Sequence, residues 1–212
     1  MINLLQNDFK NFINSNASHL PPFVGAPIVL SGITTNVDFD IEDPDRLPNG
    51  SSFILQTSAG NATYNNQSAR TLIFICYDKY LSQFDDNINH CLRCRNIGRA
   101  DFVAFSVDDN YQYFIVHELS VGGRSKYAKG IKQLHGTIHF LEKSPHVKAF
   151  IEQFKEIHLV LTTDSSPEPS PDEMASGFMA PYNLIPGVIR ITDNRFRAFG
   201  AKVYETKTVV LP

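Results

Sequence analysis

The order of the elements predicted along the chain indicates an α/β fold with a central mixed β-sheet flanked by helices. Strand-like runs rich in β-branched and aromatic residues, at 99–109, 113–120 and 157–163, surround a stretch of helical periodicity at 125–142. With 212 residues, 42% of them hydrophobic and 19% charged, the chain has the length of one domain, and we expect residues 1–212 to form it.

The first seventy residues are predicted to combine one helix with short strands. MINLLQNDFKNFINS is typical of an amphipathic helix, with Leu5, Phe9, Phe12 and Ile13 on one side, and it lacks the pattern of a signal peptide. Further along, APIVLSGITT, VDFDIEDP and SSFILQTSAG are typical of strands, whereas DPDRLPNG and GNATYNNQS are typical of loops. We expect residues 1–70 to be a helix and a β-rich extension, which either adds a strand layer over the core or acts as a specificity element.

The core is predicted within residues 71–163. TLIFICYDKY at 71–80 favours a strand, and residues 99–120 favour a β-hairpin with NYQ as its turn. A helix follows because apolar residues recur at spacings of four, three, four and three, and Ser125 can cap its start. These apolar residues are Tyr127, Ile131, Leu134, Ile138 and Leu141. HVKAFIEQFKE predicts a second helix and IHLVLTT a further strand.

The C-terminal part begins with a segment that does not predict regular structure. SPEPSPDEMASG at 166–177 is rich in proline, serine and acidic residues, so we expect a mobile loop over 164–181. GVIRIT and KTVVLP predict C-terminal strands within 182–212, with the short basic piece RFRAFGAK between them.

The charge pattern restricts the partners only locally. The net charge is −3, so no global field attracts nucleic acid or a membrane, although segment 87–150 has nine Lys and Arg against five Asp and Glu. This basic segment is compatible with a local binding site for a polyanion, and also with a chance distribution of charged residues along the chain. No apolar run approaches the roughly 18 residues of a membrane span, so we expect no membrane partner. Three cysteines, an odd number, suit a reducing compartment and predict a cytoplasmic location.

Two carboxylates in the predicted hairpin form the main candidate site. Asp101 begins the first strand and Glu118 lies near the end of the second, so an antiparallel hairpin brings them together at one edge of the sheet. Mg²⁺ prefers oxygen ligands, and a metal held there can polarise a phosphoryl group and activate water. As an exposed edge carboxylate, Glu118 should contribute little to the core, so we expect Glu118→Ala to remove cleavage while leaving folding nearly intact. The alternative is that both residues are ordinary solvent-facing strand ends without a metal.

The following helix presents basic residues near the two acids. Lys126, Lys129 and Gln133 share one face, Arg124 precedes it, and a helix N-terminus favours anions. Such groups can bind phosphate or keep a hydroxide ionised. The alternative is an ordinary solvated helix face.

The segment RADFVAFSVDDNYQYFIVHELS, followed by KGIKQLHGTI, resembles a group of small bacterial proteins in the PD-(D/E)XK nuclease superfamily. That group has a strand of the type R-C-D-F-L, then Y-F-I-E-L-K-G, then a helix ending Q-L-x-x-T-I. Short upstream and closing pieces, INHCL and FRAFGAKVYE, are similar as well. The resemblance covers residues 70–163 and part of 190–212. The matching residues are Arg99, Asp101, Phe102, Tyr113, Phe114, Ile115, Glu118, Leu119, Gln133, Leu134, Thr137 and Ile138.

The resemblance implies a restriction-endonuclease-like core over 71–163 that acts on DNA or RNA with Mg²⁺ or Mn²⁺. In it, Asp101 and Glu118 would bind the metal and Gln133 would support the site. An upstream acid would complete the pattern, and Asp85 and Asp86 are the nearest candidates. The residues implied to contact nucleic acid are Arg99, Arg124, Lys126, Lys129 and Lys132.

One departure from the pattern affects catalysis. The lysine of the family's E-x-K motif falls on position 120, where this chain has Ser120, and a hydroxyl cannot replace an ammonium group beside a phosphate. We expect a substitute in the order Lys126, Lys129 and Arg124. The other possibility is a catalytically inactive module of the same fold that binds nucleic acid or a protein partner.

The cysteines and His117 offer weaker alternatives. HCLRC contains a C-x-x-C with His90 beside it, and with Cys76 these residues could hold Zn²⁺ or part of an iron–sulfur cluster. Cys76 lies in an apolar strand, where a free cysteine packs as a small hydrophobe. His117 should point to the opposite face of its strand from Glu118, as a packed residue.

Overall fold

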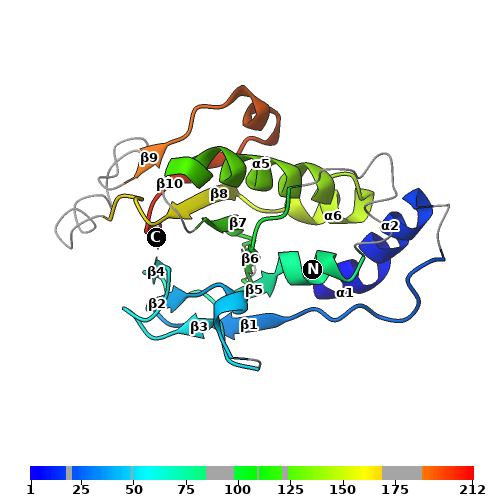
Figure 1. Ribbon diagram of the computed structural model, residues 1–212, viewed down its shortest axis with the longest axis horizontal. Coiled ribbons are helices and arrows are strands. Elements are labelled where there is room, and N and C mark those ends of the chain that lie inside the picture. Colours follow the sequence, from blue (N-terminus) through cyan, green and yellow to red (C-terminus); the bar gives the residue numbers. More distant parts are fainter. Residues whose placement is uncertain (18–20, 49, 85–97, 109, 121–123, 169–187) are drawn as a thin grey trace.

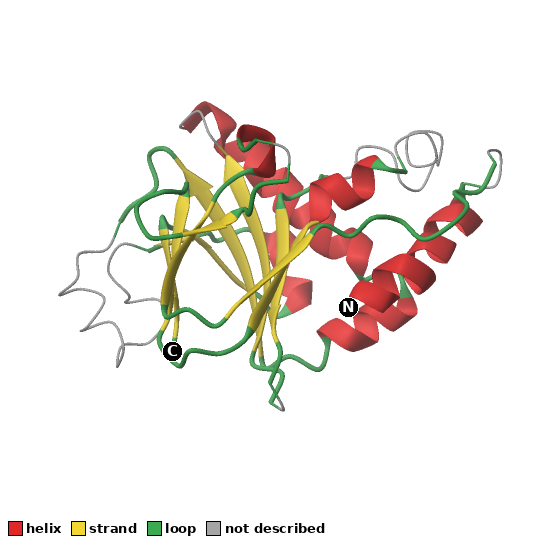
Figure 2. Cartoon of the chain, turned by 90° about the horizontal axis from the view of Figure 1, so that it is seen from below, coloured by secondary structure: helices red, strands yellow, loops and turns green. Residues whose placement is uncertain are grey.

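The chain folds into two stacked β-sheets, with most of its helices on the outer face of the larger sheet. The computed structural model describes residues 1–17, 21–48, 50–84, 98–108, 110–120, 124–168 and 188–212 (Figure 1). Seen from below, the helices gather on one side of the strands (Figure 2). The α/β class and the large mixed sheet predicted from the sequence are confirmed.

The larger sheet has seven strands and carries the candidate site at its centre. Its order is β1-β5-β6-β7-β8-β10-β9. From one edge to the other, these are β1 (Ser31–Thr34), β5 (Leu72–Cys76), β6 (Phe102–Ser106), β7 (Tyr113–Ser120), β8 (Glu156–Thr163), β10 (Lys202–Glu205) and β9 (Ile189–Arg190). Strands β5, β6 and β7 are antiparallel neighbours, while β8 runs parallel to β7 after a helical crossover. The predicted hairpin is therefore the β6–β7 pair.

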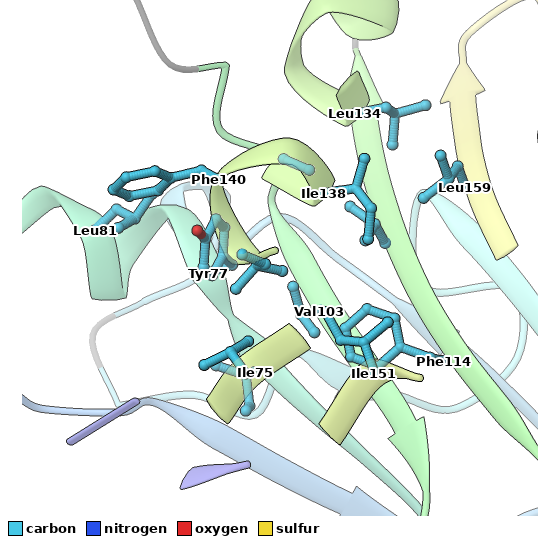
Figure 3. Close-up of a cluster of buried hydrophobic side chains, with 14 of the residues drawn as sticks. Ile75, Tyr77, Leu81, Val103, Phe114, Leu134, Ile138, Phe140, Ile151 and Leu159 are labelled. Carbon is cyan, nitrogen blue, oxygen red and sulfur yellow. The ribbon is translucent and has the colours of Figure 1, made fainter. Parts of the chain in front are cut away.

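The helices cover one face of this sheet. They are the N-terminal run of α1 (Ile2–Leu4), the π-helical η1 (Leu5–Phe9) and α2 (Lys10–Asn16), then α3 (Tyr77–Ser82), α5 (Arg124–Leu141) and α6 (Pro145–Ile151), with the short 3₁₀ helices η2 (Pro44–Arg46) and η4 (Asn194–Phe199) elsewhere. Leu134 and Ile138 of α5 lie against Leu159, Phe114 and Val103 of the sheet (Figure 3). The apolar periodicity of α5 thus marks the face that the helix buries.

The second sheet comes largely from the N-terminal extension. Its order is β11-β4-β2-β3, with β11 (Thr208–Leu211), β4 (Ala62–Asn66), β2 (Asp38–Ile41) and β3 (Ile54–Leu55). Phe39 and Tyr64 pack in one buried cluster with Phe74, Phe102 and Ile115 of the larger sheet. The extension is therefore a strand layer over the core, one of the two alternatives that the sequence left open. Strand β7 is buried on both faces, which explains the consecutive apolar residues at 113–116 in its first half.

Three local predictions were wrong. GNATYNNQS contains strand β4, not a loop, because Ala62, Tyr64 and Asn66 alternate inward while β2 and β11 pair with its two sides. The strand predicted over 71–80 ends at Cys76, and α3 begins at Tyr77. Strand β10 (Lys202–Glu205) begins at the end of the basic piece RFRAFGAK and ends before the predicted strand KTVVLP, where no strand was predicted. In each case pairing or packing with distant segments outweighed local propensity.

Two glycines allow the lead-in to β6 to lie directly on α5. A Cβ atom at Gly136 would stand 2.3 Å from the backbone nitrogen of Gly98, and a Cβ atom at Gly98 would stand 2.2 Å from the carbonyl oxygen of Lys132. Thr137 fixes the same contact, since its hydroxyl accepts a hydrogen bond from the Ala100 N–H at 2.8 Å. This packing places Asp101 beneath the helix.

We expect Gly136→Ala to destabilise the fold by about 2 to 3 kcal/mol, because its methyl group meets backbone that cannot move aside. Gly130→Ala is the matched control. It gains the same helix propensity, and its methyl group meets only the end of the buried Leu161 side chain, at 2.5 Å, so we expect a loss of at most about 1 kcal/mol. Urea unfolding of both variants measures the difference. Equal stabilities would contradict the close packing of Gly98 on α5.

Candidate functional site

Asp101 and Glu118 lie next to each other where β6 and β7 begin and end. Phe102 pairs with His117 in the register of the two strands, so the residue before the first and the residue after the second are neighbours. The Leu119 N–H donates a hydrogen bond to Oδ2 of Asp101 at 2.6 Å, which holds that carboxylate against β7. The juxtaposition predicted from the hairpin is present.

Glu118 is buried, and Asp101 is partly buried. Glu118 is only 3% exposed, and its Oε2 atom is buried without a hydrogen-bond partner among the described residues. Burial, followed by the charge of Asp101, raises the pKa of Glu118, while the positive charge of Lys129 opposes the shift. Burial likewise raises the pKa of Asp101, against the hydrogen bond from Leu119. The expectation of an exposed Glu118 was therefore wrong, because α5 covers its face of β7, whereas Asp101 is only partly covered.

Helix α5 closes the site from above. A Cβ atom at Gly130 would lie 3.5 Å from Cγ of Glu118, an ordinary contact distance, so this turn of the helix lies directly over that side chain. Lys129 is exposed at its own position, yet its charge lowers the pKa of both Asp101 and Glu118. Gln133, one turn further on, donates from Nε2 to the Arg99 carbonyl at 2.7 Å, while its buried Oε1 has no partner among the described residues.

The other basic residues predicted for the site differ in how exposed they are. Lys126 and Lys132 are exposed on α5. Arg99 is partly buried, and its Nη1 lies 3.9 Å from Oδ1 of Asp78 on α3, so its charge is already engaged. The side chain of Arg124 lies outside the described residues. Of the lysines proposed as substitutes, Lys129 is thus the one whose charge reaches both acids.

Position 120 has no cation. Ser120 lies two residues beyond Glu118 on the same face of β7, is buried and pairs with Thr163 of β8. Leu161 of β8 has a glutamate opposite it on each neighbouring strand, Glu118 on β7 and Glu205 on β10. Glu205 accepts hydrogen bonds from the hydroxyls of Thr163 and Ser166. Glu205 is therefore a buried carboxylate with its own hydrogen-bond donors.

Two further acids border the site that were not predicted from the sequence. Asp78 in the first turn of α3 and Asp43 at the N-cap of η2 both raise the pKa of Asp101. Asp78 was not predicted because residues 77–80 were assigned to a strand. An acidic residue directly after the apolar run is the signal for a helix start there, since acidic residues favour the first turn of a helix. Asp85 and Asp86, the acids proposed instead, lie outside the described residues.

The opposite face of β7 has a structural role. The Thr162 hydroxyl donates to the Thr206 carbonyl at 2.6 Å, so it accepts from Nε2–H of His117 at 2.9 Å, and Nδ1 of His117 accepts from the Tyr64 hydroxyl at 2.8 Å. Burial lowers the pKa of His117 to about 3, so the imidazole is neutral. His117 is a packed residue, as expected.

Of the cysteines considered as metal ligands, Cys76 lies within the described residues. Cys76 is a free thiol buried between the sheets, which agrees with a packing role, and burial raises its pKa to about 12. Cys91, Cys94 and His90 lie outside the described residues.

The donor atoms of the site fit a hard divalent cation. Glu118 and Gln133 offer two buried oxygen atoms without partners among the described residues, and Asp101 adds a second carboxylate. Within the described part of the chain, no group of three or more His, Cys, Asp and Glu side chains can hold a metal, so a cation here would rely on two carboxylates and the Gln133 amide oxygen. Near the ends of β7 and β8, Leu119 lines a separate hollow of about 290 Å³ with Asn61, Thr163 and Lys207.

No family model matches the chain, and comparisons with curated proteins and with solved structures give no match either. Among the described residues, no helix is both long enough and apolar enough to cross a membrane.

Proposed function

We propose that this chain belongs to the PD-(D/E)XK nuclease superfamily and hydrolyses phosphodiester bonds of DNA or RNA with Mg²⁺ or Mn²⁺. The observation that carries the proposal is the pair of adjacent carboxylates on a central hairpin, with Glu118 buried and Asp101 partly buried. A protein that only needed a stable core would not retain two adjacent acids whose burial raises both of their pKa values. The hairpin, the following helix and the parallel strand β8 appear in the order that the sequence resemblance implies, which supports a restriction-endonuclease-like core.

Each residue has a role in this proposal. Asp101 and Glu118 hold the cation, with the Gln133 amide oxygen as a third oxygen donor. A bound cation would polarise the phosphoryl group and activate the attacking water. Lys129 stabilises negative charge on the phosphoryl oxygens and takes the role of the lysine missing at position 120. Lys126 and Lys132 contact the nucleic acid backbone from the exposed face of α5.

The alternative function is an inactive module of the same fold that binds nucleic acid or a protein. Ser120 favours it, because the E-x-K lysine is replaced by a buried hydroxyl. This alternative predicts salt-dependent binding of nucleic acid, or salt-independent binding of a protein, without cleavage.

The proposal is tested by adding Mg²⁺ or Mn²⁺ to the wild type and to Asp101→Ala, and then incubating both with plasmid and single-stranded DNA and with RNA. We expect calorimetry to detect metal binding in the wild type alone, together with metal-dependent cleavage. Metal binding without cleavage would favour the inactive module. The absence of metal binding in the wild type would overturn the proposed site.

A further inference from the structure

One edge of the larger sheet carries an uncharged, apolar segment. Residues 21–37, PPFVGAPIVLSGITTNV, contain no charged residue and lead into the edge strand β1. Five of the eight large apolar side chains that are exposed among the described residues belong to this segment: Val24, Ile28, Leu30, Ile33 and Val37. Ile28 is 75% exposed and Ile33 is 66% exposed. Such a concentration at a sheet edge marks an interaction surface.

Polar side chains from two helices hold this segment in an extended path along the molecule (Figure 1). The Gln83 amide bonds both the N–H and the carbonyl of Ile28, at 2.8 and 2.7 Å. The Asn14 amide does the same for Phe23, at 2.9 and 3.1 Å, and Lys10 donates to the Gly25 carbonyl at 2.9 Å. The exposed apolar side chains are therefore presented by a backbone that is already ordered, which lowers the entropic cost of binding.

The backbone of β1 also lacks a neighbouring strand on its outer side among the described residues. Leu30 pairs directly with Cys76 of β5, since the Cys76 N–H donates to the Leu30 carbonyl at 2.9 Å. In an antiparallel ladder the bonding direction alternates, so the N–H and C=O groups of Ser31 and Ile33 point away from the sheet. Natural edge strands are commonly protected by charges, prolines or bulges, and β1 itself contains none of these charges or prolines.

We infer that β1 pairs with β1 of a second copy of this chain, antiparallel across a two-fold axis. An antiparallel pair of identical strands is self-complementary, and a segment without charge meets no repulsion from its own copy. If the axis passes at Gly32, Ile33 lies opposite Ser31 of the partner, so that a large side chain packs beside a small one. An open hollow of about 520 Å³ next to β1, lined in part by Gly32, Ser52 and Ile54, gives room for side chains of the second copy.

The test is the mass of the full-length protein in solution, measured by sedimentation over a range of concentrations. We expect a dimer for the wild type. In Ile33→Lys we expect the dimer dissociation constant to rise about tenfold or more, because a lysine from each copy enters the interface. The matched control is Val107→Lys, since Val107 is 49% exposed outside this segment and should leave the dimer intact. Ile33→Thr keeps a β-branched strand residue and should weaken the dimer less.

Melting temperatures close to that of the wild type would show that the variants are folded. A wild type that remains monomeric throughout the micromolar range would overturn the inference and leave the edge for a strand of another protein. A dimer that persists unchanged in both Ile33 variants, or that is lost equally in Val107→Lys, would overturn it as well. The inference does not depend on the proposed metal site, because metal binding by Glu118 is measured independently of the sedimentation experiment.

Discussion

Glu118→Gln is expected to stabilise the metal-free protein at pH 8 while abolishing its response to Mg²⁺. The folded state raises the pKa of Glu118, so the unfolded chain releases this proton first as the pH rises above about 4.3. The free energy of unfolding is therefore highest at acid pH, where Glu118 is protonated in both states, and it falls progressively as the pH rises towards the folded-state pKa of Glu118. A neutral glutamine removes this penalty, and we expect a gain on the order of 2 kcal/mol at pH 8 that vanishes near pH 4.

The same variant should lose the metal effect completely. Saturating Mg²⁺, at about 100 times its dissociation constant, should stabilise the wild type by about 2.7 kcal/mol and the variant by none. If the protein cleaves nucleic acid, we expect cleavage to fall about a thousandfold, which corresponds to about 4 kcal/mol of transition-state stabilisation. Thermal unfolding between pH 4 and pH 9, with and without metal, measures the stability effects.

Glu205→Gln is the matched control for this experiment. Glu205 is also buried, and it lies opposite Leu161 on the far side of β8, but its carboxylate already accepts two hydroxyl hydrogen bonds. We expect this variant to keep the full response to Mg²⁺. A metal response in Glu118→Gln equal to that of the wild type would contradict the site.

Lys129→Met is expected to separate catalysis from metal binding. The charge of Lys129 lowers the pKa of both Asp101 and Glu118, and the same charge opposes the binding of a cation there. Above the pKa values of both acids, where protons no longer compete, removing it should strengthen Mg²⁺ binding by about two- to tenfold, while cleavage falls about a hundredfold because negative charge on the phosphoryl group is no longer stabilised. Calorimetry measures the first effect and single-turnover cleavage the second.

Lys126→Met provides the comparison, since Lys126 lies one turn earlier on the same exposed side of α5. We expect its metal affinity to be unchanged and its cleavage rate to fall less than about threefold, with a smaller salt dependence of nucleic-acid binding. The reverse order, with the greater loss of cleavage in Lys126→Met, would assign the replacement of the E-x-K lysine to the earlier residue.

The sequence predicts the parts of this protein that depend on neighbouring residues. The hairpin of β6 and β7 follows from two β-branched, aromatic runs separated by a short turn, and this connection alone makes Asp101 and Glu118 neighbours. The face of α5 that packs on the sheet follows from the three- and four-residue spacing of Ile131, Leu134 and Ile138. Local periodicity and short connections are sufficient for these predictions because few alternative pairings compete with them.

The burial of the site could not be predicted in this way. Glu118 is buried because α5 packs over its face of β7 near Gly130, while β4 and β2, from a segment far upstream, cover the opposite face, where His117 lies. Asp43 and Asp78 border the site for the same reason, since each belongs to an element that reaches it only through tertiary packing. No local pattern marks them.

By itself, the sequence determined the α/β class, the pairing of Asp101 with Glu118 and the basic face of the following helix. The tertiary structure alone decided that Glu118 is shielded from water, that Lys129 is the lysine whose charge reaches both acids, and that β1 forms an uncharged edge. The physical reason is the range of the forces involved. Backbone pairing and helical periodicity act between residues close in the chain, whereas desolvation and charge–charge interaction depend on every segment that packs around a group.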